Sequence, residues 1–167
     1  MEDRNYWDSF SESEKQENIQ YMLNNAELEN VLRKWKNSKE TEEDFLEFVN
    51  AFIKSNDNDA GLIVAVKSNV VKPGVDNIEF LTGKQHGMVQ TAATQDGKAY
   101  AMVFTSKERF QKCCNDLSGI IMFMEDVFVT LEKKEELDGI VINAGAEEII
   151  LDKTMMRAII SVLNPNL

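Results

Sequence analysis

The sequence predicts an α+β fold in which N-terminal helices are followed by a mixed β-sheet with a hairpin and with further helices packed on it. Apolar residues recur at helical spacing in the N-terminal third, whereas residues 61–66 form an apolar run typical of a buried strand. Strand-like runs and helical stripes then alternate. With 167 residues, 43% of them apolar, the chain is long enough for one domain with its own core.

Three helices are expected before residue 60. Residues 11–24 are highly charged and only weakly amphipathic. Thr41 and Asp44 approximate a helix-start pattern for the third helix. The second and third helices have clear apolar stripes, made of Leu28, Val31, Leu32 and Trp35, and of Phe45, Phe48, Val49, Phe52 and Ile53. We therefore divide the chain into a partly helical extension, 1–24, and a single domain, 25–167.

A β-hairpin is expected around residues 96–97. Asp-Gly favours a two-residue loop, here between strands at 88–94 and 98–104. The register that follows pairs Ala93 with Tyr100, Thr91 with Met102 and Val89 with Phe104.

Helices and strands alternate in the rest of the chain. Thr105 and Glu108 fit a capping box that opens a helix. Asp152 is expected to cap the last helix, which Pro165 ends. Between them we expect strands at 120–123, 139–143 and 148–151, a helix at 125–136 and a turn at 144–146.

Charge and composition exclude several classes of protein. The chain has 18 basic and 29 acidic residues, a net charge of -11, and no basic stripe, so nucleic-acid binding is not expected. No apolar run approaches the roughly 20 residues that cross a bilayer, and the N-terminus is unlike a signal peptide. Two adjacent cysteines cannot form a disulfide framework. The expected location is the cytoplasm.

Residues typical of catalysis are scarce. His86 is the only histidine, and one histidine with two adjacent cysteines is a poor zinc site. Cys113 and Cys114 fall on the apolar stripe of their helix, which predicts a buried face, with thiol chemistry as the alternative. No phosphate-binding glycine loop or calcium loop is present. We therefore expect no catalytic residue, no metal and no cofactor.

Three segments of the C-terminal half carry a family resemblance: Phe104–Glu108, Leu137–Asn143 and Glu147–Leu151. In this order, and with a closing helix, they resemble the N-terminal domain of the SseB (enhanced serine sensitivity) family over residues 25–163. Ala144 stands where the family usually has proline. The resemblance implies a bacterial α+β domain with a regulatory or protein-interaction role and without established catalytic activity, and it supplies no catalytic residues.

One loop is the tentative binding site. Asn143, Gly145, Glu147 and Glu148 would lie together beside the strand ends. The leading hypothesis is a non-enzymatic regulatory or protein-binding module. Its partner would be another protein with a basic face, because 15 acidic residues against 7 basic ones make the first 59 residues strongly negative. The alternatives are a small enzyme that uses carboxylates and a homo-oligomer subunit.

Overall fold

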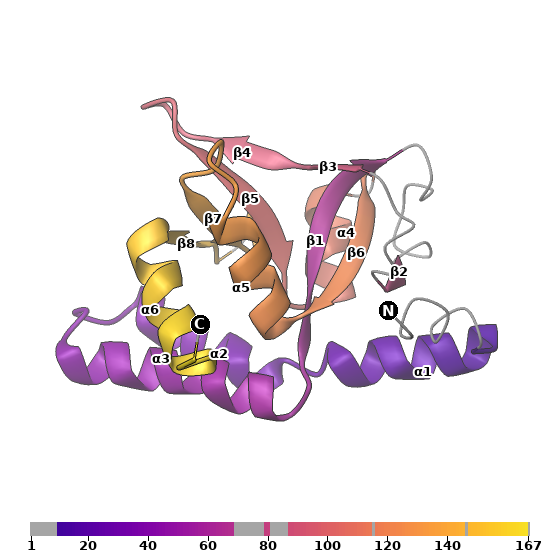
Figure 1. Ribbon diagram of the computed structural model, residues 1–167, viewed down its shortest axis with the longest axis horizontal. Coiled ribbons are helices and arrows are strands. Elements are labelled where there is room, and N and C mark those ends of the chain that lie inside the picture. Colours follow the sequence, from indigo (N-terminus) through magenta and orange to yellow (C-terminus); the bar gives the residue numbers. More distant parts are fainter. Residues whose placement is uncertain (1–9, 69–78, 81–86, 115, 146, 167) are drawn as a thin grey trace.

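The computed structural model describes residues 10–68, 79–80, 87–114, 116–145 and 147–166. It confirms the α+β class, with three helices ahead of a mixed sheet on which further helices pack (Figure 1). The helices are α1 (Glu12–Met22), α2 (Ala26–Lys36), α3 (Glu42–Asp57), α4 (Lys107–Cys114), α5 (Met124–Glu132) and α6 (Lys153–Leu163). His86 lies outside the described residues.

The strands form one sheet with the order β2-β6-β1-β5-β7-β8. Their bounds are β1 (Gly61–Ser68), β2 (Glu79–Phe80), β3 (Gly87–Val89), β4 (Thr91–Ala93), β5 (Ala99–Phe104), β6 (Ser118–Phe123), β7 (Gly139–Ile142) and β8 (Ile149–Asp152). The β1 strand is antiparallel to β5 and β6, and β5 is parallel to β7. The sheet is therefore mixed, as predicted.

Strands β1 and β5 separate partway along their length, and the segment 87–93 fills the fork. They pair directly at Ile63–Phe104 and Val64–Val103. Beyond that point β3 pairs with β1 and β4 pairs with β5. Gln90 connects both sides, because its N–H donates to the Ala65 carbonyl (2.9 Å) and its carbonyl accepts from the Met102 N–H (3.0 Å).

The predicted hairpin register was wrong by one residue. Ala93 pairs with Ala99, not with Tyr100, and the loop contains three residues, 95–97, instead of two. Gly97 adopts φ +81°, the left-handed conformation that closes such a loop. A shift of one residue moves every side chain to the opposite face of the sheet.

The other two predicted residue pairs of the hairpin are also wrong. Thr91 pairs with Ala101 of β5 instead of Met102. Val89 pairs with Val66 of β1 and not with Phe104, because the first hairpin strand crosses from β5 to β1 at the fork.

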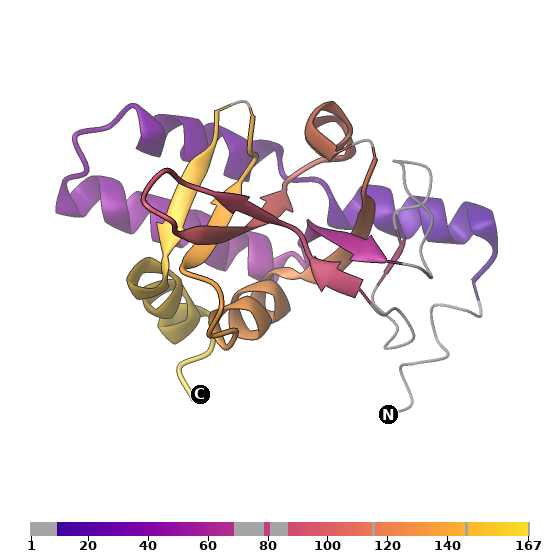
Figure 2. The ribbon, with the colours of Figure 1, turned by 90° about the horizontal axis from the view of Figure 1, so that it is seen from above.

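Helices cover both faces of the sheet. Seen from above, α5 and α6 lie on one side and α4 on the other (Figure 2). The larger core joins α2, α3, α5 and α6 to one face, where Phe52 meets Phe48 and Phe128 edge to face at 5.1 and 5.3 Å. The smaller core joins α4 and α1 to the other face, with Ile19 and Met22 of α1 buried there. Helix α1 thus belongs to the packed structure.

The helix starts were predicted with mixed success. Thr41 and Asp44 form the reciprocal capping box at α3, and Asp152 caps α6 by accepting from the Met155 N–H, as expected. The capping box predicted at Thr105 is wrong. Ser106 Oγ accepts from the Arg109 N–H at the start of α4, and the Thr105 side chain points elsewhere. No helix among the described segments has the length and apolarity needed to cross a membrane.

Candidate functional site

The predicted binding residues lie on the loop between β7 and β8, and the structure separates them into buried and exposed. Asn143 is 5% exposed, whereas Gly145, Glu147 and Glu148 face solvent. Asn143, Gly145 and Glu147 have φ values of +58°, +91° and +55°. Asparagine and glycine tolerate this left-handed region better than most residues, which makes a tight turn possible here.

The buried Asn143 side chain is bonded to Thr105. Its Oδ1 accepts from the Thr105 N–H at 3.0 Å, and its Nδ2 donates to Thr105 Oγ1 at 3.0 Å. Because β5 and β7 are parallel neighbours, both residues follow their strands at the same edge of the sheet. Asn143 therefore holds the loop in place and offers a ligand little of its own side chain.

A chain of ion pairs continues from Thr105 to the surface. Thr105 Oγ1 donates to Glu29 of α2 at 2.5 Å, and the same Glu29 oxygen accepts from Arg109 Nε at 3.2 Å. Arg109 Nη2 then donates to Glu147 at 3.1 Å, and Arg33 Nε donates to Glu147 at 3.2 Å. We call Glu29, Arg109, Glu147 and Arg33 the salt-bridge chain. It ties α2, α4 and the β7–β8 loop together.

Two arginines keep Glu147 ionised. The hydrogen bonds from Arg33 and, second, from Arg109 hold the pKa of Glu147 below its ordinary value. A general acid or base works best when its pKa lies near the operating pH. Glu147 is therefore suited to being a fixed negative charge and unsuited to proton transfer.

A surface hollow of about 630 Å³ lies beside this chain, and we call it the α4 hollow. Its volume falls in the range of small-ligand sites. Asn143, Gly145 and Glu147 line it, so the structure brings three of the four predicted residues to one depression. The fourth, Glu148, accepts a long hydrogen bond from the Gly145 N–H at 3.4 Å and receives the Lys36 ammonium on its carbonyl at 3.0 Å. The other lining residues are Glu29, Arg33, Ser106, Glu108, Arg109, Lys112, Cys113 and Ala144.

The two cysteines differ, which corrects the prediction of one buried face. Cys114 is 1% exposed in the smaller core, and burial raises the pKa of its thiol to about 12. Cys113 is exposed and lines the α4 hollow. The reason is that α4 has only eight residues and turns Phe110 and Cys114, one helical turn apart, toward the sheet. Only this narrow stripe of α4 contacts the sheet, so Cys113, one residue before Cys114, points to solvent.

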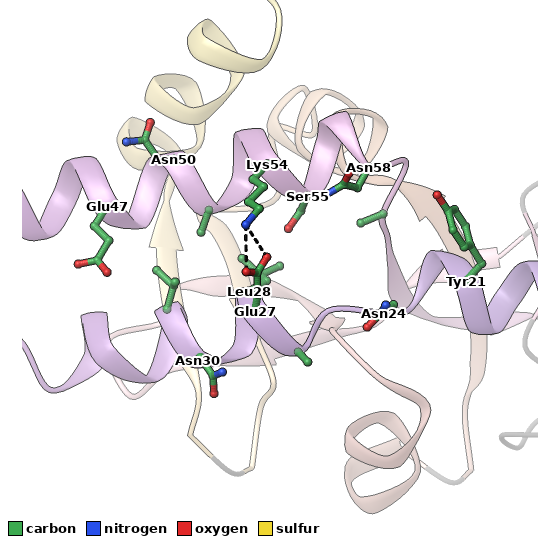
Figure 3. A pocket seen from close by; sticks show the side chains of 14 residues that line it. Tyr21, Asn24, Glu27, Leu28, Asn30, Glu47, Asn50, Lys54, Ser55 and Asn58 are labelled. Atoms are coloured by element: carbon green, nitrogen blue, oxygen red, sulfur yellow. Dashed lines mark hydrogen bonds and ion pairs between the residues drawn. The ribbon is translucent and has the colours of Figure 1, made fainter.

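A second depression, which we call the α2–α3 groove, was not predicted (Figure 3). It also measures about 630 Å³ and runs between the two helices. The sequence did contain one signal, because Asn30 and Asn50 lie inside helices, where asparagine is a poor former. The lining residues are Tyr21, Asn24, Ala26, Glu27, Leu28, Asn30, Val31, Glu47, Asn50, Ala51, Lys54, Ser55, Asn58 and Ala60.

Fold and site together define an α+β domain with ligand-sized depressions, and in the α4 hollow and the α2–α3 groove the charged side chains are largely paired. Within the described segments, no three His, Cys, Asp or Glu side chains come together as a metal site requires.

The family model of the SseB protein N-terminal domain matches residues 28–158, most of the chain. This chain belongs to the SseB family, which confirms the resemblance. No curated protein and no solved structure matches it.

Proposed function

We propose that this protein is a non-enzymatic regulatory module of the bacterial cytoplasm that binds another protein through the α4 hollow and the β7–β8 loop. The observation that carries the proposal is the salt-bridge chain, which fixes a ligand-sized depression from three separate elements. A surface held in this way is preorganised, and preorganisation lowers the entropic cost of binding.

The charges of the hollow support recognition better than acid–base catalysis. Glu29 and Glu147 are both engaged by arginines, and the lowered pKa of Glu147 keeps its negative charge in place at neutral pH. On the rim, Glu108 and Lys112 make no ion pair with any described residue and are open to a partner. Rim charges of this kind set the rate and selectivity of association more than its final affinity.

The partner should carry a basic face. The chain has a net charge of -11, so a complementary surface would be drawn to it over distances of about a Debye length. A second copy of this acidic chain is disfavoured by the same charge. Homo-oligomer formation is nevertheless the alternative, and the experiment must distinguish it from binding of a different protein.

Affinity capture from the native lysate tests the proposal with two matched variants. Glu108→Lys reverses a charge on the rim of the hollow, and Glu135→Lys makes the same change in net charge at an exposed residue outside it. We expect the partner to be lost with Glu108→Lys and at high salt, and to be kept with Glu135→Lys. Equal capture by both variants would show that the hollow is not the binding surface. Recovery of only the chain itself would favour a homo-oligomer.

An enzymatic role predicts a different result. Turnover of a small molecule by the purified protein, abolished by Glu29→Gln while the thermal melting curve stays that of a folded protein, would contradict a non-enzymatic role.

Thiol chemistry at Cys113 is a second candidate function, because the structure leaves this one thiol exposed in the hollow, next in sequence to Lys112. The thiolate is the nucleophilic form of cysteine, and alkylation requires an accessible sulfur atom. The test is the rate of iodoacetamide modification of the folded protein. Reactive-site chemistry requires that Cys113 react faster than a cysteine in an unstructured peptide and that Cys113→Ser remove the fast phase. A rate no faster than the peptide's would eliminate this candidate.

A further inference from the structure

We propose that Arg33 and Arg109 form a binding site for the carboxylate of a small organic acid, and that Glu147 occupies this site when no ligand is bound. Glu147 is then an internal competitor, which an incoming carboxylate displaces. The site lies in the α4 hollow, but ligand binding does not require the partner protein proposed above. Only an effect of the ligand on that partner rests on the proposed function.

Two guanidinium groups converge on one carboxylate in this structure. Arg33 Nε, from α2, donates to both Glu147 oxygens at 3.2 and 3.3 Å. Arg109 Nη2, from α4, donates to Glu147 Oε2 at 3.1 Å. The planar guanidinium group carries several N–H donors in a fixed arrangement, which matches the two oxygens of a carboxylate. The contact with Glu147 therefore shows which chemical group these two arginines recognise.

Arg109 is held in place independently of Glu147. Its side chain is only 20% exposed, and its Nε donates to Glu29 at 3.2 Å. Its backbone N–H donates to Ser106 Oγ at 3.2 Å at the start of α4. When Glu147 leaves, an oriented guanidinium group remains, and binding to such a preorganised group costs less entropy.

Glu147 is held less firmly than Arg109. The side chains of Glu147 and Arg33 are 47% and 48% exposed. Each exposed ion pair typically shifts an equilibrium by about fivefold or less, because water competes for both charges. The backbone of Glu147 also has φ +55°, a left-handed conformation that strains a residue other than glycine. A ligand carboxylate can therefore replace Glu147 without breaking a strong contact.

The charge of the hollow becomes positive when Glu147 leaves it. Three basic and three acidic side chains line the hollow: Arg33, Arg109, Lys112, Glu29, Glu108 and Glu147. With Glu147 in place these charges balance, and without it three basic groups face two acidic ones, which leaves a charge of +1. This local positive charge favours an anionic ligand.

A small acid suits the site better than an acidic segment of a protein. The chain has a net charge of -11, so an acidic protein surface would be repelled along the whole contact. A small acid brings only the charge of its own carboxylate groups. The volume of the hollow, about 630 Å³, is also that of a small-ligand site.

The probe is succinate, titrated into the isotopically labelled full chain while NMR follows the Nε–H signals of the arginine side chains. We expect the signals of Arg33 and Arg109 to shift. Glu147→Ala removes the internal competitor and should tighten succinate binding about tenfold. Glu148→Ala is the matched control, because it makes the same change in net charge in the same loop but outside the lining of the hollow. It should leave the affinity unchanged.

A second pair of variants tests the recognition itself. Arg33→Gln, made in the Glu147→Ala protein, should weaken succinate binding by about tenfold or more, because it removes a charged donor. Lys39→Gln in the same protein makes the same change in net charge at an exposed residue outside the hollow and should have no effect. Succinamide, which is neutral, should not bind.

Three results would overturn the proposal: equal succinate affinities in Glu147→Ala and Glu148→Ala, arginine signals that succinate does not shift in Glu147→Ala, or inorganic phosphate binding in preference to succinate. These measurements use the purified chain without a partner. A partner captured by the wild type and lost with Glu108→Lys, together with no succinate binding, would support the proposed function and refute the carboxylate site.

Discussion

Asn143 and Thr105 exchange two hydrogen bonds of 3.0 Å at the ends of the parallel strands β7 and β5. Both side chains are buried, at 5% and 0% exposure. Buried polar groups are costly unless they are bonded. This pair therefore fixes where the β7–β8 loop leaves the sheet, and with it the position of Glu147 in the salt-bridge chain.

Removing the Thr105 hydroxyl should destabilise the protein. Thr105→Val keeps the shape but leaves Asn143 Nδ2 and Glu29 without this partner, and we expect a loss of about 1–3 kcal/mol in the free energy of unfolding. Urea denaturation monitored by circular dichroism measures it. Thr105→Ser retains the oxygen and should lose less. A larger loss in Thr105→Ser than in Thr105→Val would mean that the methyl packing, and not the hydroxyl, matters.

The stability contribution of Glu147 should depend on pH. Its folded-state pKa lies below the ordinary value of 4.5, so the contribution is fully present above about pH 4.5 and is lost as pH falls through the folded pKa. Arg33→Gln removes the main cause, and the titration midpoint of Glu147 should move up toward its ordinary value. Carboxyl chemical shifts in an NMR titration report this directly. An unchanged midpoint would assign the shift to Arg109.

Asn25 should be far less tolerant of substitution than its neighbour Asn24. The Asn25 amide donates to the carbonyls of Gly61 (2.9 Å) and Thr105 (3.0 Å) and is 3% exposed. Asn25→Asp would aim a buried carboxylate at two carbonyl oxygens, and we expect a cost of about 3 kcal/mol or more. Asn24→Asp, at an exposed position, should change stability by less than about 0.5 kcal/mol. Thermal unfolding of the two variants makes the comparison, and similar melting temperatures would contradict it.

Two glycines should respond differently to alanine. A Cβ at Gly139 would lie 2.0 Å from the Leu151 carbonyl oxygen, in the paired strand β8. The strands would have to separate, so Gly139→Ala should cost more than about 3 kcal/mol. Gly97 has open space around it and φ +81°, and its alanine variant should cost only about 1–2 kcal/mol from backbone strain. Denaturation midpoints in the order wild type, Gly97→Ala, Gly139→Ala are expected, and the reverse order of the two variants is the result that would refute this.

Local patterns in the sequence predicted much of the fold. The stripes of α2 and α3, the helix start at Thr41 and the cap at Asp152 involve residues within about two helical turns of one another, where spacing determines contact. The hairpin register depended on whether the loop has two residues or three. Asp-Gly is compatible with both loops, and the fork between β1 and β5 favoured the register that was not predicted.

The candidate site was harder to predict, because its contacts are not local. The β7–β8 loop could be identified from Asn143 and Gly145, which are turn residues. Arg33 and Glu29 lie more than a hundred residues earlier than that loop, and no spacing rule shows that α2 crosses the sheet edge beside it. Thr105 was assigned to a helix cap for the same reason: its bonding partners, Glu29 and Asn143, come from distant parts of the chain.

Helix α1 has a consequence for how the family's domain can be isolated. The matched region begins at Leu28, after α1 ends, yet Ile19 and Met22 complete the smaller core with Ile63 of β1 and Ile121 of the neighbouring strand β6. A fragment trimmed to the matched region would expose these apolar side chains of the sheet face to water, and large exposed apolar patches promote aggregation. We therefore expect such a fragment to aggregate. Helix α1 would then be needed to keep this apolar part of the sheet away from water.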